Sequence, residues 1–549
     1  MNAWIAQVEQ RLAAEPMADL KSLEAQPGWR HFPSAVLAAA VLYAKPHPTN
    51  PRHHDPRMLA LATKIGDLLA TENEKGNYEA RLDSHRDTYM WLDAYRLLER
   101  DLDDERRARW RREIEKNIAT LATESAVRVD FPWYQSPYIR TSPNHYSLWA
   151  SSTHLAGRVF RNPEWESLGA RIMHRFAAEE QTPDGYWGEH SRDGPTPGYD
   201  YLTMTAVALY YEHSRDKAAL EALRRSTDFH KYFTYPDGTP VEVINDRNRY
   251  WGVSPWGQFG FSHFPDGRRY AEFLTSFFRE DSLQIETLGR MAQNALYYHE
   301  GSTAPISQEQ PRYVHQMSVP AGIRKTGPWV VCLSGLISTQ AVDSQFYLDR
   351  QGHLSVFHET LGLIITGANS KRQPELATLS EKHIGQLFHL PMSSRLLMSD
   401  ARDRLSLAYH TFFSDLEIPT PTERQVSFRF SITGKGRPPQ EARLTLQLRL
   451  KAGEALETAS GRRVLGADKI SLGPEELGGW IRHNGWTLRV DPTARLAWPV
   501  YPFNPYANGP ETRLEQAVGT ISVPLRLNTQ LGKSLRPAEQ QIAFTLEAN

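Results

Sequence analysis

The hydrophobic pattern of this chain changes its period near residue 300, and that change limits the possible folds more than any other feature. Before this point, apolar residues recur at helical spacing in segments separated by turns that contain Pro, Gly or Asn. After residue 310, short apolar or alternating runs bounded by Gly, Asn, Asp and Pro indicate strands. We therefore expect an all-α half followed by an all-β half.

The helical half predicts a series of hairpins without heptads, which is typical of an α/α toroid or an α-solenoid. The sequence shows no fixed-period repeat, and this favours the toroid, here an incomplete barrel of helical hairpins. The expected helices are 4–14, 35–43, 57–72, 78–100, 104–124, 146–160, 163–180, 201–214, 216–233 and 272–298.

The second half contains many short strands with no helices between them, which indicates a large antiparallel β-sandwich. We expect a toroid domain over 1–300, a polar linker over 301–311 and a β-sandwich domain over 312–549. The expected strands are 329–337, 345–349, 354–358, 361–366, 405–412, 426–432, 443–450, 487–490, 519–525 and 542–546.

Composition excludes several classes of protein. A formal net charge of −1 argues against a protein that binds nucleic acid or a membrane surface. The single cysteine, Cys332, leaves no internal disulfide and no cysteine-based metal site. The sequence has no run of about 18 apolar residues and no signal peptide, so we expect a cytoplasmic protein, or a periplasmic one if its native N-terminus lies upstream. Nothing in the sequence indicates its oligomeric state.

Three polar, aromatic-rich stretches stand at expected helix ends or turns, where the residues of a toroid can converge on one mouth of the barrel. A loop with so many functional side chains suggests a binding or catalytic surface on a rigid scaffold. The stretches are FPWYQSPYIRTSPNHYSLWAS (131–151), QTPDGYWGEHSRDGPTPGYDY (181–201) and VEVINDRNRYW (241–251).

The order of residues in these stretches resembles that of the toroid-plus-sandwich polysaccharide lyases, the group of hyaluronate, chondroitin AC and xanthan lyases, and more loosely that of heparinase II/III-type enzymes. In that group an Asn opens a helix after an aromatic-rich loop, as Asn144 does here, although the usual Asn-Trp pair is Asn-His. The segment DGYWGEH ends at His190, and Tyr199 follows nine positions later after a glycine. NDRNR supplies Arg247 and Arg249.

The resemblance implies a lyase that cleaves the glycosidic bond to a uronic acid by β-elimination and leaves a 4,5-unsaturated uronate. Asn144 would neutralise the uronate carboxylate, so that negative charge can develop at the reacting carbon. Tyr199 would act as general base and then acid, with His190 assisting or serving as the base itself. Arg247 and Arg249 would favour the phenolate or bind the carboxylate. No cofactor is required, and the expected partner is a uronate-containing saccharide.

Further residues are expected to bind the sugar through ring stacking, ion pairs or hydrogen bonds. They are Trp133, Arg140, His145, Trp187, Arg192, Tyr201, Asn245, Trp251 and Trp256. Each candidate also has a structural interpretation: Asn144 as a helix N-cap, the tryptophans and Tyr199 as core, and the two arginines as surface ion pairs with Glu242 or Asp246. Tyr201 is the main rival of Tyr199 for the catalytic role.

Two other functions stay open. A glycoside hydrolase on the same toroid would need two carboxylates, for which the sequence offers Asp83, Asp87, Glu189, Asp193 and Asp200. A non-catalytic carbohydrate-binding protein would need none. A metal in the β half is a weaker hypothesis, based on the histidines His353, His358, His383 and His389. The chain has no P-loop, dinucleotide fingerprint or GxSxG motif.

Overall fold

The protein was analysed as a computed structural model, which describes residues 1–15, 20–25, 29, 31–76, 85–135, 142–189, 191–245, 252–253, 256–278, 285–337, 352–367, 373–436, 439–504, 509–531 and 534–549. They form two compact units. Unit 1 comprises Met1–Trp187, Gly198–Phe229 and Val253–Ile306, and unit 2 comprises Gly188–Pro197, His230–Gly252 and Ser307–Asn549. Two segments of the helical half thus belong to the unit that contains the strands, and the domain boundary expected at 301–311 stays a prediction.

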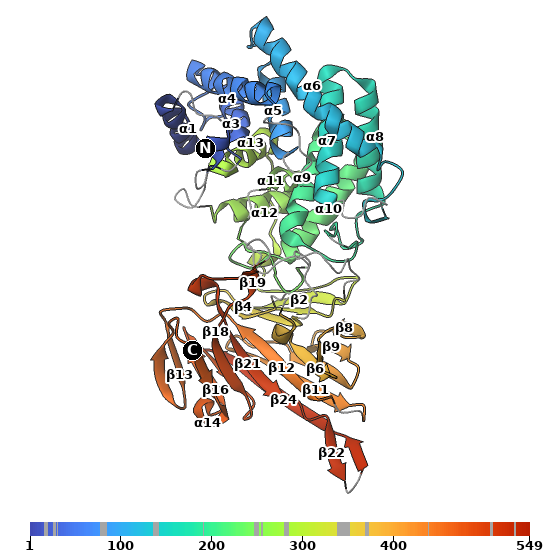
Figure 1. Ribbon diagram of the computed structural model, residues 1–549, viewed down its shortest axis with the longest axis vertical. Coiled ribbons are helices and arrows are strands. Elements are labelled where there is room, and N and C mark those ends of the chain that lie inside the picture. Colours follow the sequence, from blue (N-terminus) through green and yellow to red (C-terminus); the bar gives the residue numbers. More distant parts are fainter. Residues whose placement is uncertain are drawn as a thin grey trace. The chain divides into compact units, whose positions relative to one another are not determined.

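The first 300 residues form helices, as the sequence predicts, and Figure 1 shows them in blue to green. None of the helices in the described ranges is both long and apolar enough to cross a membrane. The described α-helices are α1 (Asn2–Ala14), α2 (Leu20–Glu24), α3 (Ala35–Ala44), α4 (Pro56–Glu74), α5 (His85–Leu98), α6 (Asp104–Ala126), α7 (Pro143–Phe160), α8 (Pro163–Ala178), α9 (Pro197–Ser214), α10 (Lys217–Tyr232), α11 (Gln258–Phe261), α12 (Pro265–Thr275), α13 (Leu288–Tyr297) and, within the β half, α14 (Pro474–Leu477).

Several of these helices begin with a proline, which is suited to the first helical position because its missing N–H has no partner there. Helix α7 begins at Pro143 and α9 at Pro197, each a few residues before the expected start. The candidates Asn144 and Tyr199 therefore lie in first helical turns rather than in loops. The single helix expected over 272–298 is wrong, because α12 ends at Thr275 and α13 begins at Leu288. Apolar residues continue at helical spacing across that break, so the pattern did not reveal it.

The second half forms strands, drawn in yellow to red in Figure 1. The strand expected over 405–412 is instead two, separated by a tight turn, and the one expected over 345–349 lies outside the described residues. The strands are β1 (Arg312–Gln316), β2 (Ala321–Thr326), β3 (Trp329–Ser334), β4 (Leu354–His358), β5 (Gly362–Thr366), β6 (Leu379–His383), β7 (Gln386–Phe388), β8 (Ser393–Met398), β9 (Arg402–Ala408), β10 (Phe412–Pro419), β11 (Gln425–Gly434), β12 (Glu441–Leu448), β13 (Ala455–Thr458), β14 (Gly461–Val464), β15 (Ile470–Leu472), β16 (Trp480–His483), β17 (Trp486–Arg489), β18 (Arg495–Val500), β19 (Phe503–Asn504), β20 (Gly509–Pro510), β21 (Val518–Pro524), β22 (Asn528–Leu531), β23 (Ser534–Pro537) and β24 (Glu539–Ala548).

Two large sheets organise these strands, and their ladders are antiparallel. One runs in the order β1-β2-β3-β4-β5-β12-β21-β18-β15, with β6 pairing β12 and β7 pairing β6. The other runs β14-β13-β16-β17-β24-β11-β10-β9-β8. Two short pairs, β19-β20 and β22-β23, complete the described strands.

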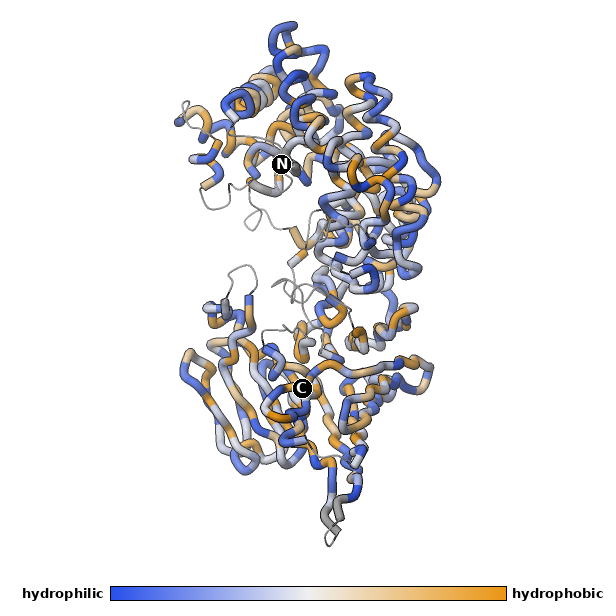
Figure 2. The backbone as a smooth tube through the Cα atoms, turned by 45° about the vertical axis from the view of Figure 1, so that its right-hand side comes forward, coloured by the Kyte–Doolittle hydropathy of each residue, from blue (hydrophilic) through white to orange (hydrophobic). Residues whose placement is uncertain are grey.

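One hydrophobic core joins the two sheets into a sandwich. It contains Val331 and Leu444 of the first sheet together with Leu405 and Phe428 of the second. Burial alternates along strands such as β11, as expected where one face of a sheet is covered. Figure 2 shows this alternation as blue and orange along the strands. The predicted antiparallel β-sandwich is thus confirmed.

A buried ion pair also links the two sheets. The guanidinium of Arg324 on β2 donates from Nε and from Nη2 to the two carboxylate oxygens of Asp403 on β9, each at 2.7 Å. Both side chains are nearly inaccessible, with exposures of 5% and 1%. Because a buried charge without its partner is costly, neither residue can be lost alone without a penalty.

We therefore predict that Arg324→Ala lowers the free energy of unfolding by about 3–5 kcal/mol, since it leaves Asp403 buried without its countercharge. The neighbouring Arg404→Ala is the control, because Arg404 pairs with Asp415 at 2.6 Å on the exposed side of β9. That change should cost no more than about 1 kcal/mol. If urea unfolding shows that the two variants lose the same free energy of unfolding, the buried ion pair does not contribute more than the exposed one.

Candidate active site

Helices α7 and α8 form an antiparallel hairpin that brings the first polar stretch and the start of the second, residues 181–187, to one end of unit 1. The hairpin closes with a short connection at residues 161–162, so the start of α7 lies beside the end of α8. The two helices approach so closely that a Cβ at Gly169 would stand 2.5 Å from the carbonyl oxygen of Ala150. The loop before α7 and the loop after α8 therefore meet.

A buried carboxylate, Glu180, holds these two loops together. Its Oε2 accepts a hydrogen bond from the backbone N–H of Trp133 at 2.8 Å, and its Oε1 accepts from Nε of Arg175 at 2.6 Å. Nη2 of Arg175 in turn donates to the carbonyl oxygen of Phe131 at 2.6 Å. Burial raises the pKa of the Glu180 carboxyl, against the opposing effects of the Trp133 amide and of Arg175. Sequence reasoning missed this network, because both residues looked like ordinary surface positions of a helix end.

The turn at the start of the second stretch packs tightly on α10. Gly185 adopts a φ of +91°, and a Cβ there would lie 2.2 Å from the carbonyl oxygen of Arg225, so only glycine fits without strain. Gln181 secures the turn by donating from Nε2 to the carbonyl oxygens of Gly185 at 2.9 Å and Ala222 at 3.0 Å. Its Oε1 accepts from Nε of Arg225 at 2.7 Å. The turn at Asp184 and Gly185 is thus a rigid support.

The loop then connects to the first turn of α9. Oδ1 of Asp200 accepts a hydrogen bond from the backbone N–H of Trp187 at 2.8 Å. The indole of Trp187 stacks on Phe176 with 5.2 Å between ring centroids, and its Nε1 donates to the Phe176 carbonyl oxygen. These contacts fix where α9 begins, and with it the position of Tyr199.

Asn144 lies in the first turn of α7 and is 1% exposed. The N-cap is Ser142, so the interpretation of Asn144 as the capping residue is wrong. Its Nδ2 donates to Oγ of Ser142 at 2.6 Å, which orients the amide. The next residue, His145, is partly exposed and lies 6.2 Å from the Trp149 ring.

The two rival tyrosines differ in their surroundings. Tyr199 is half-buried at the edge of the unit 1 core. Tyr201 is 2% exposed, its hydroxyl lies 2.7 Å from that of Tyr270, and its ring meets Phe261 edge-on. The hydroxyl of Tyr201 is therefore occupied inside the core, whereas Tyr199 retains accessible surface.

The described part of the third stretch belongs to unit 2 and is held by another buried carboxylate. Glu242 accepts from the hydroxyl of Tyr235 at 2.9 Å, from that of Thr366 at 3.1 Å and from the backbone N–H of Gly367 at 2.9 Å. Burial raises its pKa. Glu242 is thus an interior anchor rather than a surface residue, and the buried Asn245 lies three positions after it in the chain.

The described tryptophans of the sugar-binding set are buried in the core of unit 1, which favours the core interpretation that the sequence left open. Trp187 is covered by Phe176, and Trp256 is covered by the guanidinium of Arg290, whose Cζ lies 3.6 Å from the ring centroid. Arg192, in unit 2, is exposed. The other predicted site residues lie outside the described residues and stay predictions: Arg140, His190, Arg247, Arg249 and Trp251.

Two of the four β-half histidines proposed as metal ligands, His353 and His358, make other hydrogen bonds. Nδ1 of His353 lies 2.8 Å from the carbonyl oxygen of Ser334, so this nitrogen carries the proton and donates. Nε2 lies 2.9 Å from the hydroxyl of Tyr409 and accepts from it. Both ring nitrogens are occupied, and burial lowers the pKa of His353 to about 4. Nδ1 of His358 accepts from the backbone N–H of Thr360.

We predict that removing the Glu180 carboxylate loosens both loops. Glu180→Ala should lower the free energy of unfolding by about 2–4 kcal/mol, because it leaves a buried amide and a guanidinium without their acceptor. Glu179→Ala is the matched control, since Glu179 is exposed, and it should stay within about 0.5 kcal/mol of the parent. Urea unfolding measures both, and a Glu180 variant as stable as its control would refute the anchor.

The buried imidazole of His353 should make the stability of the β-sandwich depend on pH. Its folded pKa of about 4 lies below the ordinary value of 6.5, so the unfolded chain takes up a proton first as the pH falls. The stability from this group is complete above pH 6.5 and is lost between 6.5 and about 4, at up to about 1.4 kcal/mol per pH unit. In urea unfolding followed over this window, His353→Gln should show a shallower loss than the parent. Parallel pH profiles would rule out this role.

No family model and no curated protein matches the sequence. Among solved structures, the chain is similar to a mutant of the heparan sulfate lyase HepC from Pedobacter heparinus, with a TM-score of 0.51 and 11% identity over 94% of this chain and 76% of that one. It is also similar to the chondroitin AC lyase of Streptomyces coelicolor in complex with chondroitin sulphate, with a TM-score of 0.50 and 12% identity over 100% of this chain and 79% of that one. The chain therefore has the α/α-toroid-plus-β-sandwich fold of these lyases, which confirms the fold predicted from the sequence.

Proposed function

We propose that this protein is a polysaccharide or oligosaccharide lyase that cleaves a glycosidic bond to a uronic acid by β-elimination. Its fold is shared with two lyases whose names give heparan sulfate and chondroitin as substrates, and the likeness to the second extends over the whole chain. The observation that carries the proposal is the contrast between the half-buried Tyr199 and Tyr201, since the hydroxyl of Tyr201 is already engaged with that of Tyr270 inside the core.

The reaction needs donors that stabilise negative charge on the uronate as its C5 proton leaves. The positive end of the α7 dipole favours an anion near the first turn, where Asn144 lies. The amide of Asn144 is oriented by Ser142 and surrounded by protein, which strengthens its hydrogen bonds relative to those in water. We assign to Asn144 the neutralisation of the uronate carboxylate.

Tyr199 has a position suited to proton transfer. It lies in the first turn of α9 and is only half-buried, so a substrate can approach its ring and hydroxyl. In the proposed reaction the phenolate takes the C5 proton, the bond from C4 to the leaving oxygen breaks, and C4 and C5 become doubly bonded. The new phenol then returns the proton to the leaving oxygen. His190, Arg247 and Arg249 keep the roles that the resemblance implies: a second base, and the cations that favour the phenolate.

The buried carboxylate of Asp200 does not favour the hydrolase alternative, because it accepts the Trp187 amide and supports the loop. A hydrolase would need two acids that face the substrate, one of them able to deliver a proton to the leaving oxygen. The product distinguishes the two reactions, since elimination consumes no water and creates a double bond conjugated with the carboxylate.

We predict that Tyr199→Phe lowers kcat on uronate oligosaccharides by roughly 10²–10⁴-fold, the usual contribution of general acid–base catalysis. Tyr201→Phe is the matched control, because it removes the same hydroxyl group from a side chain that is only 2% exposed. This change should lower the free energy of unfolding by about 1 kcal/mol and leave most of the activity. Ultraviolet absorbance of the unsaturated product, on chondroitin and heparan oligosaccharides, measures both.

Three outcomes separate the hypotheses. Absorbance that rises with the parent and is lost only in the Tyr199 variant supports the lyase and its assignment. Cleavage of the saccharide seen by chromatography without new absorbance would contradict the lyase proposal and favour a hydrolase. Binding without any turnover, unchanged by either substitution, would indicate a carbohydrate-binding protein.

A further inference from the structure

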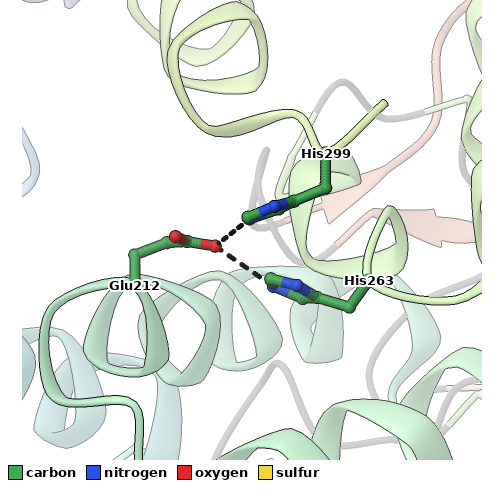
Figure 3. A group of neighbouring side chains, drawn as sticks. All are labelled: Glu212, His263 and His299. Atoms are coloured by element: carbon green, nitrogen blue, oxygen red, sulfur yellow. Dashed lines mark hydrogen bonds and ion pairs between the residues drawn. The ribbon is translucent and has the colours of Figure 1, made fainter. Parts of the chain in front are cut away.

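A Glu-His-His cluster lies in unit 1, apart from the three polar stretches (Figure 3). Glu212 lies near the C-terminal end of α9, His263 between α11 and α12, and His299 directly after α13. Oε1 of Glu212 is 2.7 Å from Nε2 of His299 and 3.1 Å from Nε2 of His263. Figure 3 shows both imidazoles directed toward this one carboxylate oxygen.

The spacing fits a small tetrahedral cation. One ligand atom from each residue lies within 4.8 Å of the others. Zinc binds imidazole nitrogen and carboxylate oxygen at about 2.0–2.1 Å, which puts two ligands of a tetrahedral site about 3.3 Å apart. The observed separations of 2.7 and 3.1 Å therefore need to widen by about 0.6 and 0.2 Å to reach this spacing.

An ordinary ion pair explains His299 but leaves His263 unexplained. His299 makes a hydrogen bond to Glu212. Nε2 of His263 lies within ion-pair distance of the same oxygen, yet it has no hydrogen-bond partner in the described part of the chain, and its side chain is 6% exposed. A buried ring nitrogen without a hydrogen-bond partner is costly, and in the tautomer that leaves Nε2 unprotonated its lone pair can bind a metal ion.

Neighbouring groups hold the three ligands in place. Oε2 of Glu212 pairs with the more exposed Arg215 at 3.1 Å, which leaves Oε1 to face the imidazoles. The ring of His263 meets Tyr211 edge-on at 4.8 Å, and the backbone N–H of His299 donates to Oγ of Ser262 at 3.0 Å. Such outer contacts fix ligand orientation in metal sites. The side chain of His299 is 37% exposed, so an ion and a water ligand can reach the cluster.

The cluster is remote from the proposed catalytic tyrosine, which lies in the first turn of the same helix. Glu212 lies thirteen positions after Tyr199, or roughly 20 Å along α9 at 1.5 Å per residue. We propose that Glu212, His263 and His299 bind a divalent transition metal of the zinc class, with water as the fourth ligand, and that this metal ties the end of α9 to α12 and α13. The inference does not rest on the proposed lyase activity.

Zinc binding by the metal-stripped, tag-free full chain tests the proposal. Isothermal titration calorimetry with zinc should give one site per chain, and cobalt in its place should give the intense visible bands of a tetrahedral complex. His263→Ala and Glu212→Gln should each weaken zinc at least tenfold. Because His263 is buried, His299→Gln is added as a variant at a more exposed position that should keep the fold. His174→Gln, which changes an exposed imidazole paired with Asp216, should bind zinc as the parent does.

A second readout is thermal stability. Zinc should raise the Tm of the parent and of the His174 variant, and should raise the Tm of the three ligand variants by less. The proposal is overturned if the parent binds no zinc at micromolar concentrations. It is also overturned if folded His299→Gln protein binds zinc as tightly as the parent does, because the metal then occupies another place.

Discussion

The buried carboxylate of Glu180 is the interaction on which the arrangement of unit 1 depends. A loop that opens a helix has backbone groups that need partners, and in the interior only protein can supply them. Glu180 and Arg175 together provide acceptors and donors for the loop before α7 from a single point at the end of α8. The start of α7, with Asn144, is thereby set relative to the loop that leads to Tyr199.

The same device recurs in each of the three polar stretches. Glu180 accepts the amide of Trp133, Asp200 accepts that of Trp187, and Glu242 accepts that of Gly367. A carboxylate taken out of water is expensive, so each is retained where its hydrogen bonds also fix a loop. This use of acids bears on function. Asp200, one of the carboxylates that a hydrolase could have aimed at its substrate, is turned inward and supports the backbone of Trp187.

The sequence predicts the fold well because periodicity is a collective signal. Ten expected helices and a run of strands needed only the spacing of apolar residues, and that spacing survives local errors. The predicted helix boundaries were wrong where a residue type occurs both in loops and at helix starts. Pro143 and Pro197 were interpreted as loop residues, although proline also starts helices, and this placed Asn144 and Tyr199 outside the helices that hold them. The break after Thr275 carries no such marker at all.

Contacts between distant residues were beyond the sequence for a different reason. Arg175, Glu180 and Glu212 sit on helices where charged residues are ordinary, and only the packing of other segments shows that they face inward. The tryptophans were predicted to face a sugar but lie inside the protein. An aromatic residue beside a turn can either bind a sugar or pack in the core, and Trp187 packs on Phe176.

Helix α9 connects the two proposals of function and metal binding. Its first turn holds Tyr199, and its last turn holds Glu212. An α-helix transmits displacement along its axis with little compression, because each turn is fixed by its own hydrogen bonds. A metal that binds Glu212 to His263 and His299 would therefore limit sliding of α9 against α12 and α13. The hydroxyl of Tyr199 would then be positioned from both ends of its helix, by Asp200 and Trp187 at one and by the Glu-His-His cluster at the other.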